Sequence, residues 1–248
     1  MEEEKPWTGP LAEAEGAAIC YGGHPSQLRL SGLDWKIAAG SYWVVGGPPD
    51  SGKTDLLATM AGLQRPAGGV VRIFGRDVTE LGEPDLLKLR TKVGFVFKGG
   101  GRMFSDLTVA ENIALPLRYH QNLDADHALD TVHALLDLTD LGNIGPERPQ
   151  RLGMSQQQRV GLARALALKP DALFLDEPLA GLGWRHRQWW LDFLQELSSG
   201  AAFMDRKKLA VVVTTNDFAP WSGRRVEYAV IRDQRWQMLG EQKEPPNV

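Results

Sequence analysis

Residues 47–54 read Gly47-Pro48-Pro49-Asp50-Ser51-Gly52-Lys53-Thr54, which has the spacing G-x-x-x-x-G-K-[ST]. The pattern is typical of a phosphate-binding loop, in which backbone N–H groups and the N-terminus of the following helix face phosphate oxygens. A chance match is expected in roughly 1% of chains of this length. The surroundings favour the functional interpretation, because a buried strand is predicted at 42–45 and a helix at 55–63.

In such a loop Lys53 reaches the outer phosphates of a nucleotide, and the Thr54 hydroxyl ligates Mg²⁺. Two residues in the loop oppose tight binding, since Pro49 removes a backbone donor and Asp50 brings a negative charge towards the phosphates. Asp50 is nevertheless compatible with a left-handed backbone conformation. The predicted nucleotide-binding residues of this segment are Gly47, Asp50, Ser51, Gly52, Lys53, Thr54 and Asp55.

A second candidate site follows the apolar run at 172–175, which ends in Asp176 and Glu177. A phosphate-binding loop that carries out chemistry needs a carboxylate to hold Mg²⁺, which we assign to Asp176 together with Thr54. Glu177 could then polarise the attacking water. An apolar strand that ends in Asp-Glu is commonplace alone, but together with the loop it indicates a nucleotide site.

The composition of the whole chain is that of an ordinary globular protein, with 248 residues, 43% apolar and 24% charged. A formal net charge of −3 provides no general basic field, so nucleic acid is not an expected partner. The single cysteine, Cys20, excludes an internal disulfide, and the N-terminus has no basic, apolar signal, which favours the cytoplasm. The longest apolar runs, such as 209–213, are far shorter than the ~20 residues that a membrane span requires.

The pattern along the chain predicts one domain at 17–240 between a loose N-terminal tail at 1–16 and a C-terminal tail at 241–248. Short strands at 17–21, 27–30 and 33–37 indicate an antiparallel β subdomain that leads into the buried strand at 42–45, and another strand is predicted at 70–74. A helical subdomain is predicted at about 105–168, with breaks near Pro116, Asp124 and 142–149. Buried parallel strands at 173–176 and 209–213, with a helix at 185–197 between them, complete an α/β fold with a mainly parallel sheet.

Several further motifs occur in order along 17–240, and together with the loop they resemble the ATP-binding subunits of ABC transporters, which have a P-loop NTPase core. Tyr21 stands where that family places an aromatic residue that stacks on adenine. Lys98 follows the strand at 93–97 at the position of the family's glutamine. Residues 152–159, Leu-Gly-Met-Ser-Gln-Gln-Gln-Arg, match the signature Leu-Ser-Gly-Gly-Gln. Gly183 matches a loop position normally occupied by Asp, and Asn216 matches one normally occupied by His.

The resemblance implies ATP and Mg²⁺ as cofactors, with Glu177, Asn216 and Lys98 at the catalytic positions. It implies a peripheral place on the cytoplasmic face of the membrane, a permease as partner, and a head-to-tail dimer with an identical or different ATP-binding subunit. The segment 97–117 looks most like subunits that drive lipid transport of the mammalian-cell-entry (MCE) type, which implies an MCE-type protein partner. We also predict that the chain joins its membrane complex through a groove near 98–117, which carries the apolar residues Met103, Phe104, Leu107 and Val109.

The departures from the family pattern fall on residues that touch the terminal phosphate or the attacking water. Lys98 replaces a glutamine that can ligate Mg²⁺, and Asn216 replaces a histidine that can be charged. Gly153 removes a signature hydroxyl and Met154 replaces a glycine, while Ser155 is predicted to cap the following helix. Gly183 removes the aspartate through which subunits communicate.

We therefore expect a site that binds Mg-nucleotide but hydrolyses it slowly or only with help from a partner. Two alternatives stay open: an active variant whose partner restores the missing groups, and a non-hydrolysing nucleotide-binding scaffold subunit of a membrane complex. A soluble ABC-type protein that acts on nucleic acid is disfavoured, because such proteins usually join two of these domains in one chain.

Overall fold

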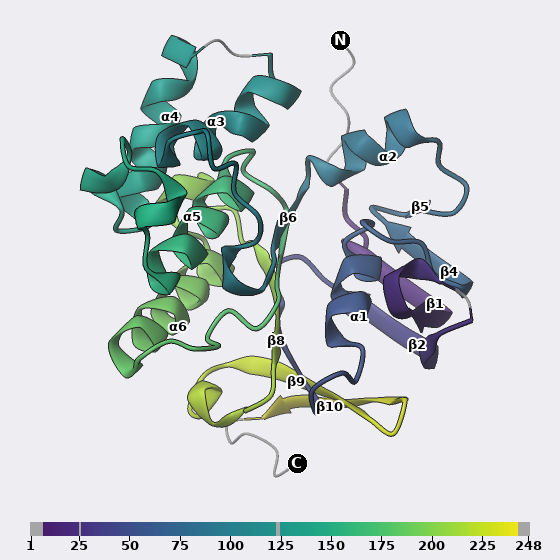
Figure 1. Cartoon of the computed structure of the whole chain (residues 1–248). Helices are drawn as coiled ribbons and strands as arrows, with labels where there is room; N and C mark the ends of the chain where they lie inside the picture. The colour runs from purple at the N-terminus through teal and green to yellow at the C-terminus, as the bar shows by residue number, and fades with distance from the viewer. Residues whose placement is uncertain (1–6, 25, 123–124, 243–248) are drawn as a thin grey trace.

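The computed structural model describes residues 7–24, 26–122 and 125–242. Within these residues the chain forms a six-stranded sheet, a four-stranded sheet and helices on both sides of the larger sheet, as Figure 1 shows. The two sheets and the helices enclose two hydrophobic clusters, one on each side of the larger sheet. The predicted α/β architecture is confirmed.

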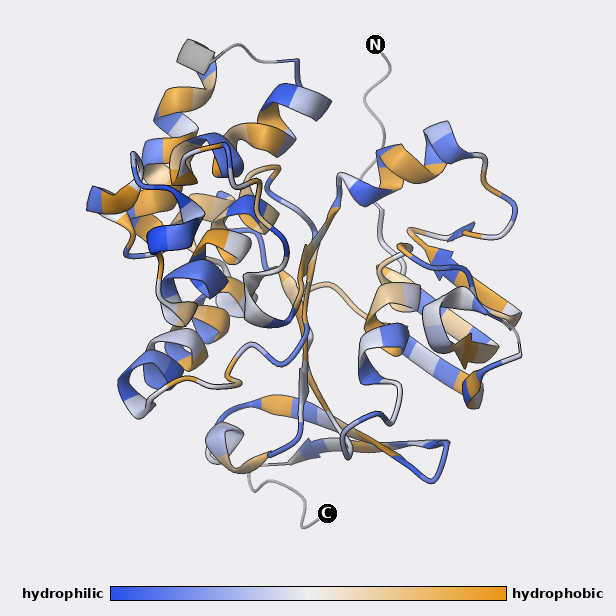
Figure 2. Ribbon diagram, in the orientation of Figure 1, coloured by the Kyte–Doolittle hydropathy of each residue, from blue (hydrophilic) through white to orange (hydrophobic). Residues whose placement is uncertain are grey.

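The larger sheet has the strand order β10-β9-β3-β8-β7-β6, and its neighbouring strands are parallel except for the edge pair β10 and β9. Its strands are β3 (Tyr42–Gly46), β6 (Val93–Val96), β7 (Ala172–Leu175), β8 (Ala210–Thr215), β9 (Val226–Arg232) and β10 (Arg235–Gln242). Because β3, β7 and β8 are covered on both faces, their residues form continuous hydrophobic runs, visible as the orange band in Figure 2. The carboxyl ends of these parallel strands meet at one edge, where α/β proteins bind ligands.

The smaller sheet is antiparallel and has the order β2-β1-β4-β5. Its strands are β1 (Ala12–Cys20), β2 (Leu28–Ile37), β4 (Gly68–Ile73) and β5 (Arg76–Asp77). The predicted tail at 1–16 is therefore too long, because residues 12–16 belong to β1 and pair with both neighbours. The strands predicted at 27–30 and 33–37 are one strand, since Gly32 (φ 65°) absorbs an extra residue between the pairs Ile19–Leu30 and Ala17–Leu33.

The helices are α1 (Lys53–Met60), α2 (Glu83–Arg90), α3 (Val109–His120), α4 (Ala125–Leu138), α5 (Met154–Leu166) and α6 (Trp184–Ser199). In Figure 1, α3 to α6 cover one side of the larger sheet, while α1, α2 and the smaller sheet lie on the other. The break predicted at Pro116 is wrong, because α3 continues through it and loses only the hydrogen bond to the carbonyl of Asn112. The break predicted near Asp124 lies outside the described residues.

The loop before α3 is fixed by buried polar contacts. The amide of Asn112, which is fully buried, accepts from Phe104 N–H at 2.8 Å and donates to the carbonyl oxygens of Phe104, Leu107 and Thr108. Thr108 begins α3 in a capping box with Glu111, and the two Thr108 hydrogen bonds lower the pKa of that carboxyl.

This arrangement affects the groove at 98–117 through which the chain is predicted to join its membrane complex. Phe104 is exposed, but Val109 is fully buried in the core, and Met103 and Leu107 are half-buried. The hydrophobic surface that the loop offers is therefore smaller than the sequence predicts, because α3 directs Val109 inward rather than towards solvent.

Candidate nucleotide-binding site

The phosphate-binding loop joins β3 to α1 at the ligand-binding edge of the sheet. Gly52 begins α1 in a left-handed conformation (φ 92°), and Asp50 is also left-handed (φ 59°), as the sequence allowed. The Lys53 ammonium is 4% exposed and donates to the carbonyl oxygens of Gly47 (2.9 Å) and Pro48 (2.8 Å). Burial lowers the pKa of Lys53, and the nearby Glu177 opposes that change.

Asp176 lies at the end of β7 and accepts two hydroxyl hydrogen bonds. Thr54 donates to its Oδ2 at 2.8 Å, and Thr214, at the end of β8, donates to its Oδ1 at 2.7 Å. Thr214 also accepts the backbone N–H of Glu177 at 2.9 Å. The two residues predicted to ligate Mg²⁺, Thr54 and Asp176, are thus in direct contact.

Glu177 is held by polar groups from three different segments. The Lys98 ammonium lies 2.7 Å from its Oε2, the Asn216 amide donates to its Oε1 at 3.0 Å, and the Lys53 ammonium lies 4.0 Å from Oε1. The hydrogen bond to Glu177 raises the pKa of Lys98. Lys98, Asn216 and Glu177, the three predicted catalytic residues, therefore form one cluster, and Lys98 pairs with the carboxylate rather than standing apart from it.

A pocket of about 370 Å³ connects this cluster to the end of β1. Tyr21 is 52% exposed at its outer end, and the Arg29 guanidinium lies over the ring, 5.1 Å from its centroid. Asp55 lines the pocket, but its carboxylate accepts the N–H of Gly22 at 2.9 Å, so it holds the Tyr21 turn in place. The pocket lining is Tyr21, Arg29, Pro49, Asp50, Gly52, Lys53, Thr54, Asp55, Lys98, Asp176, Glu177 and Asn216.

The donors of the loop fit a phosphorylated ligand. The Ser51 hydroxyl oxygen is buried and has no hydrogen-bond partner among the described residues, while the hydrogen bonds of Lys53 go to loop carbonyls that an anion could replace. No group of three or more His, Cys, Asp or Glu side chains in the described ranges is arranged to hold a metal ion. Mg²⁺ would thus be held by Thr54 and Asp176 together with phosphate oxygens.

Sequence reasoning missed two residues of the site. Thr214 bridges Asp176 and Glu177, and the only signal for it was its place at the end of the strand that neighbours β7. Arg29 lies on β2, far from any motif, and nothing in its sequence surroundings indicates that it faces the pocket.

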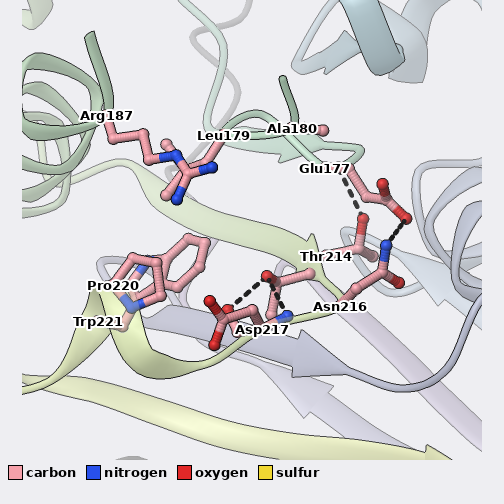
Figure 3. A pocket seen from close by; sticks show the side chains of 10 residues that line it. Glu177, Leu179, Ala180, Arg187, Thr214, Asn216, Asp217, Pro220 and Trp221 are labelled. Atoms are coloured by element: carbon pink, nitrogen blue, oxygen red, sulfur yellow. Dashed lines mark hydrogen bonds between the residues drawn. The ribbon is translucent and has the colours of Figure 1, made fainter. Parts of the chain in front are cut away.

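A second hollow of about 110 Å³ lies on the other side of Glu177 and is shown in Figure 3. Asn216 and Thr214 separate it from the larger pocket through their bonds to Glu177, drawn as dashed lines. Arg187 of α6 faces this hollow and donates to the Leu182 carbonyl at 2.8 Å. Glu177 thus lines both hollows.

The signature segment lies outside the pocket lining. Gly153 caps α5, and its N–H is bound by the Gln156 side chain at 3.0 Å, so the prediction that Ser155 caps this helix is wrong. Met154 is 56% exposed. It lies against Gly181, since a Cβ added at Gly181 would be 2.7 Å from the Met154 sulfur. Gly183 begins α6, next to Trp184, which is 74% exposed. All of these residues except the partly buried Ser155 and Gln156 are exposed to solvent, so they lie on the surface of the protein.

Comparison with known proteins agrees with this geometry. Residues 30–180 match the family model described as ABC transporter. The chain is 38% identical over 180 residues to the spermidine/putrescine import ATP-binding protein PotA of Thermobifida fusca, covering 72% of this chain and 45% of that protein. It is 33% identical over 215 residues to the probable sulfate/thiosulfate import ATP-binding protein CysA of Chlorella vulgaris, covering 87% and 86% respectively. The chain thus spans about half the length of some relatives and most of others.

Among solved structures, the dimeric ATP-binding cassette MJ0796 bound to ADP and Pi superposes with a TM-score of 0.79 at 25% identity, covering 94% of this chain and 98% of that one. The fold, the phosphate-binding loop and the two acidic residues that follow β7 define a P-loop nucleotide-binding protein. The chain belongs to the ABC transporter family, as one of its ATP-binding subunits. Within the described ranges, no helix combines the length and apolar character that crossing a membrane requires.

Proposed function

We propose that this chain powers a membrane importer and that Lys98 restrains its hydrolytic glutamate. The observation that carries the proposal is the 2.7 Å contact between the Lys98 ammonium and Glu177 Oε2. Import is supported by the two relatives named above, whose own names describe import of a polyamine and of sulfate or thiosulfate.

Nucleotide binding would rest on the loop and the pocket. Lys53 would exchange the carbonyls of Gly47 and Pro48 for the outer phosphates, and Tyr21 would stack on the base. Bound Mg²⁺ would stabilise negative charge on the phosphate oxygens, held by Thr54 and Asp176. The donor lost at Pro49 and the charge of Asp50 weaken binding without removing these groups.

Hydrolysis would require Glu177 to accept a proton from a water molecule. Asn216 orients the carboxylate by donating to Oε1, which leaves Oε2 as the oxygen that would receive the proton. Lys98 already donates a hydrogen bond to Oε2, so that oxygen is occupied where a water molecule would have to approach. Turnover would therefore wait until a partner subunit or the bound phosphates draw Lys98 away.

The test is ATP binding and steady-state hydrolysis in the native membrane complex. The variants are Lys53→Ala, Glu177→Gln and the double variant Lys98→Gln with Asn216→His. We expect Lys53→Ala to weaken binding and the double variant to hydrolyse at least about tenfold faster than the natural complex, since one preorganised group alone can change a rate by about 10²–10³.

Equal rates in the natural and double-variant complexes, both abolished by Glu177→Gln, would show that the site is an ordinary active variant. Tight binding with no turnover in either complex would favour the second candidate function, a non-hydrolysing scaffold subunit. That candidate is favoured by the same Lys98–Glu177 contact, because it leaves binding groups intact while it blocks the base.

We propose that this chain pairs head to tail with a second ATP-binding subunit, with the exposed Met154 and Gly183 at the contact. Pairing is supported by the MJ0796 cassette, which is described as dimeric. Lipid transport and an MCE-type partner, which segment 97–117 suggested, stay predictions. Identifying the proteins that copurify with this chain from membranes would decide between a lipid system and an importer of small ions.

A further inference from the structure

A cation that belongs to no motif lies beside the phosphate-binding loop. Arg29, on β2, lines the same pocket as Lys53 and Thr54. Its side-chain stem crosses the loop at Gly52, where an added Cβ would come within 2.8 Å of Arg29 Cβ and 3.3 Å of its Cγ. The stem of Arg29 therefore lies beside the N-terminus of α1, and a helix N-terminus is where an anion binds.

The polar contacts of the pocket leave Arg29 available. Lys53 is bound by the carbonyls of Gly47 and Pro48, and Lys98 by the carboxylate of Glu177. Arg29, in contrast, has no ion pair with any residue in the described part of the chain, and its guanidinium lies against the ring of Tyr21. A guanidinium on an aromatic face keeps its five N–H donors free at the edge, where they can bind a phosphate.

We propose that Arg29 is a nucleotide-binding residue of this chain and that its guanidinium contacts the diphosphate group held by the loop. The proposal rests on the nucleotide binding proposed above and adds a residue that the loop motif does not contain. Arg29 lies between Tyr21, which would stack on the base, and Gly52 of the loop, which would hold the phosphates. Its charge would offset two weaknesses of the loop, the donor missing at Pro49 and the negative charge of Asp50, both of which line the pocket.

The alternative is that Arg29 only holds the Tyr21 ring in place for the base. The two roles differ in the ligands they affect. A phosphate contact acts on every ligand with a diphosphate group, including one that has no base. A contact that only positions Tyr21 acts on ligands with a base and leaves pyrophosphate unaffected.

The experiment uses the full chain and competition against a fluorescent ADP analogue, with ATP, ADP and inorganic pyrophosphate as competitors in the presence of Mg²⁺. Arg29→Met keeps the stem that packs on Gly52, and Arg29→Lys keeps the charge. Arg72→Met is the matched control, because Arg72 is an arginine of the same sheet that pairs with Glu15 and lies outside the pocket. Thermal unfolding without ligand checks that each variant folds.

We expect Arg29→Met to weaken ATP, ADP and pyrophosphate by a similar factor of about ten, the loss typical of one hydrogen bond to a charged group. Arg29→Lys should recover part of that loss, and Arg72→Met should change nothing. Unchanged pyrophosphate affinity with weakened ATP and ADP would assign Arg29 to Tyr21 alone. Unchanged affinity for all three would overturn the proposal, whereas failure of the natural chain to bind any of them would overturn the proposed function itself.

Discussion

The Lys98 ammonium and Glu177 Oε2 are 2.7 Å apart, and this pair joins the segments that follow two neighbouring strands, β6 and β7. Lys98 is 59% exposed, whereas Glu177 is only 13% exposed. The lysine can therefore move into solvent at little cost, while the glutamate cannot leave its position. In the proposed function, control of hydrolysis therefore rests on Lys98, the exposed partner.

Removing the charge of Lys98 should accelerate hydrolysis even without a replacement amide. We expect Lys98→Met to raise the steady-state rate of the native complex several-fold, because Oε2 of Glu177 is freed, and Lys98→Gln to raise it further, because an amide can orient water. Lys88→Met, an exposed lysine of α2, is the control. A rate that falls in both Lys98 variants would show that Lys98 assists the chemistry rather than restrains it.

The restraint should not depend on pH in the neutral range. The hydrogen bond to Glu177 raises the pKa of Lys98 beyond its ordinary range, so the lysine keeps the charge that holds the pair throughout the neutral range and loses it only as the pH rises through that raised pKa. We expect the ratio of the Lys98→Met rate to the natural rate to stay constant between about pH 6 and 9. A ratio that falls across this interval would mean that Lys98 loses its proton in the assembled complex.

The sequence predicted the nucleotide-binding loop and the acidic pair better than it predicted the side chains that contact them. The loop 47–54 and the pair Asp176–Glu177 were predictable, because each follows a buried strand whose carboxyl end must lie at the ligand-binding edge. The pairing of Lys98 with Glu177 was not predictable, since spacing along the chain does not determine which acceptor an ammonium finds. Arg29 was out of reach, because its approach to Gly52 depends on how the two sheets pack.

The loop that carries Lys98 should be sensitive to its glycines in a position-specific way. Gly99 (φ 72°) and Gly100 (φ 90°) are both left-handed, so alanine strains either by about 1 kcal/mol. At Gly99 nothing lies within 4 Å of an added Cβ, whereas at Gly100 it would overlap the carbonyl of Gln157 in α5. We expect Gly100→Ala to lower the free energy of unfolding in urea by about 1–3 kcal/mol more than Gly99→Ala.

The same pair of variants tests whether this contact positions Lys98. If Gly100 seats the loop on α5, Gly100→Ala should also raise the hydrolysis rate of the native complex, because Lys98 moves away from Glu177, while Gly99→Ala should leave it near the natural value. Equal unfolding free energies for both variants would show that the loop adjusts without cost.

Thr214 should be essential for the geometry of both carboxylates, although no motif marks it. Its hydroxyl is fully buried, donates to Asp176 Oδ1 at 2.7 Å and accepts from the Glu177 N–H at 2.9 Å. Thr214→Val keeps the shape but leaves a buried acceptor and a buried donor unsatisfied, which costs about 1–3 kcal/mol for each group. We expect a lower free energy of unfolding and weaker Mg²⁺-dependent ATP binding, because Asp176 is no longer held towards Thr54.

The control variant Thr59→Val separates the loss of stability from the loss of Mg²⁺-dependent ATP binding. Thr59 is equally buried, but its hydroxyl donates to the Asp55 carbonyl within α1 and touches neither carboxylate. We expect Thr59→Val to reduce stability while the Mg²⁺ dependence of binding stays as in the natural chain, whereas Thr214→Val changes both. If Thr214→Val preserves the Mg²⁺ dependence and lowers only stability, then Asp176 is positioned by Thr54 and the strand end alone, and the bridge at Thr214 serves the fold rather than the metal.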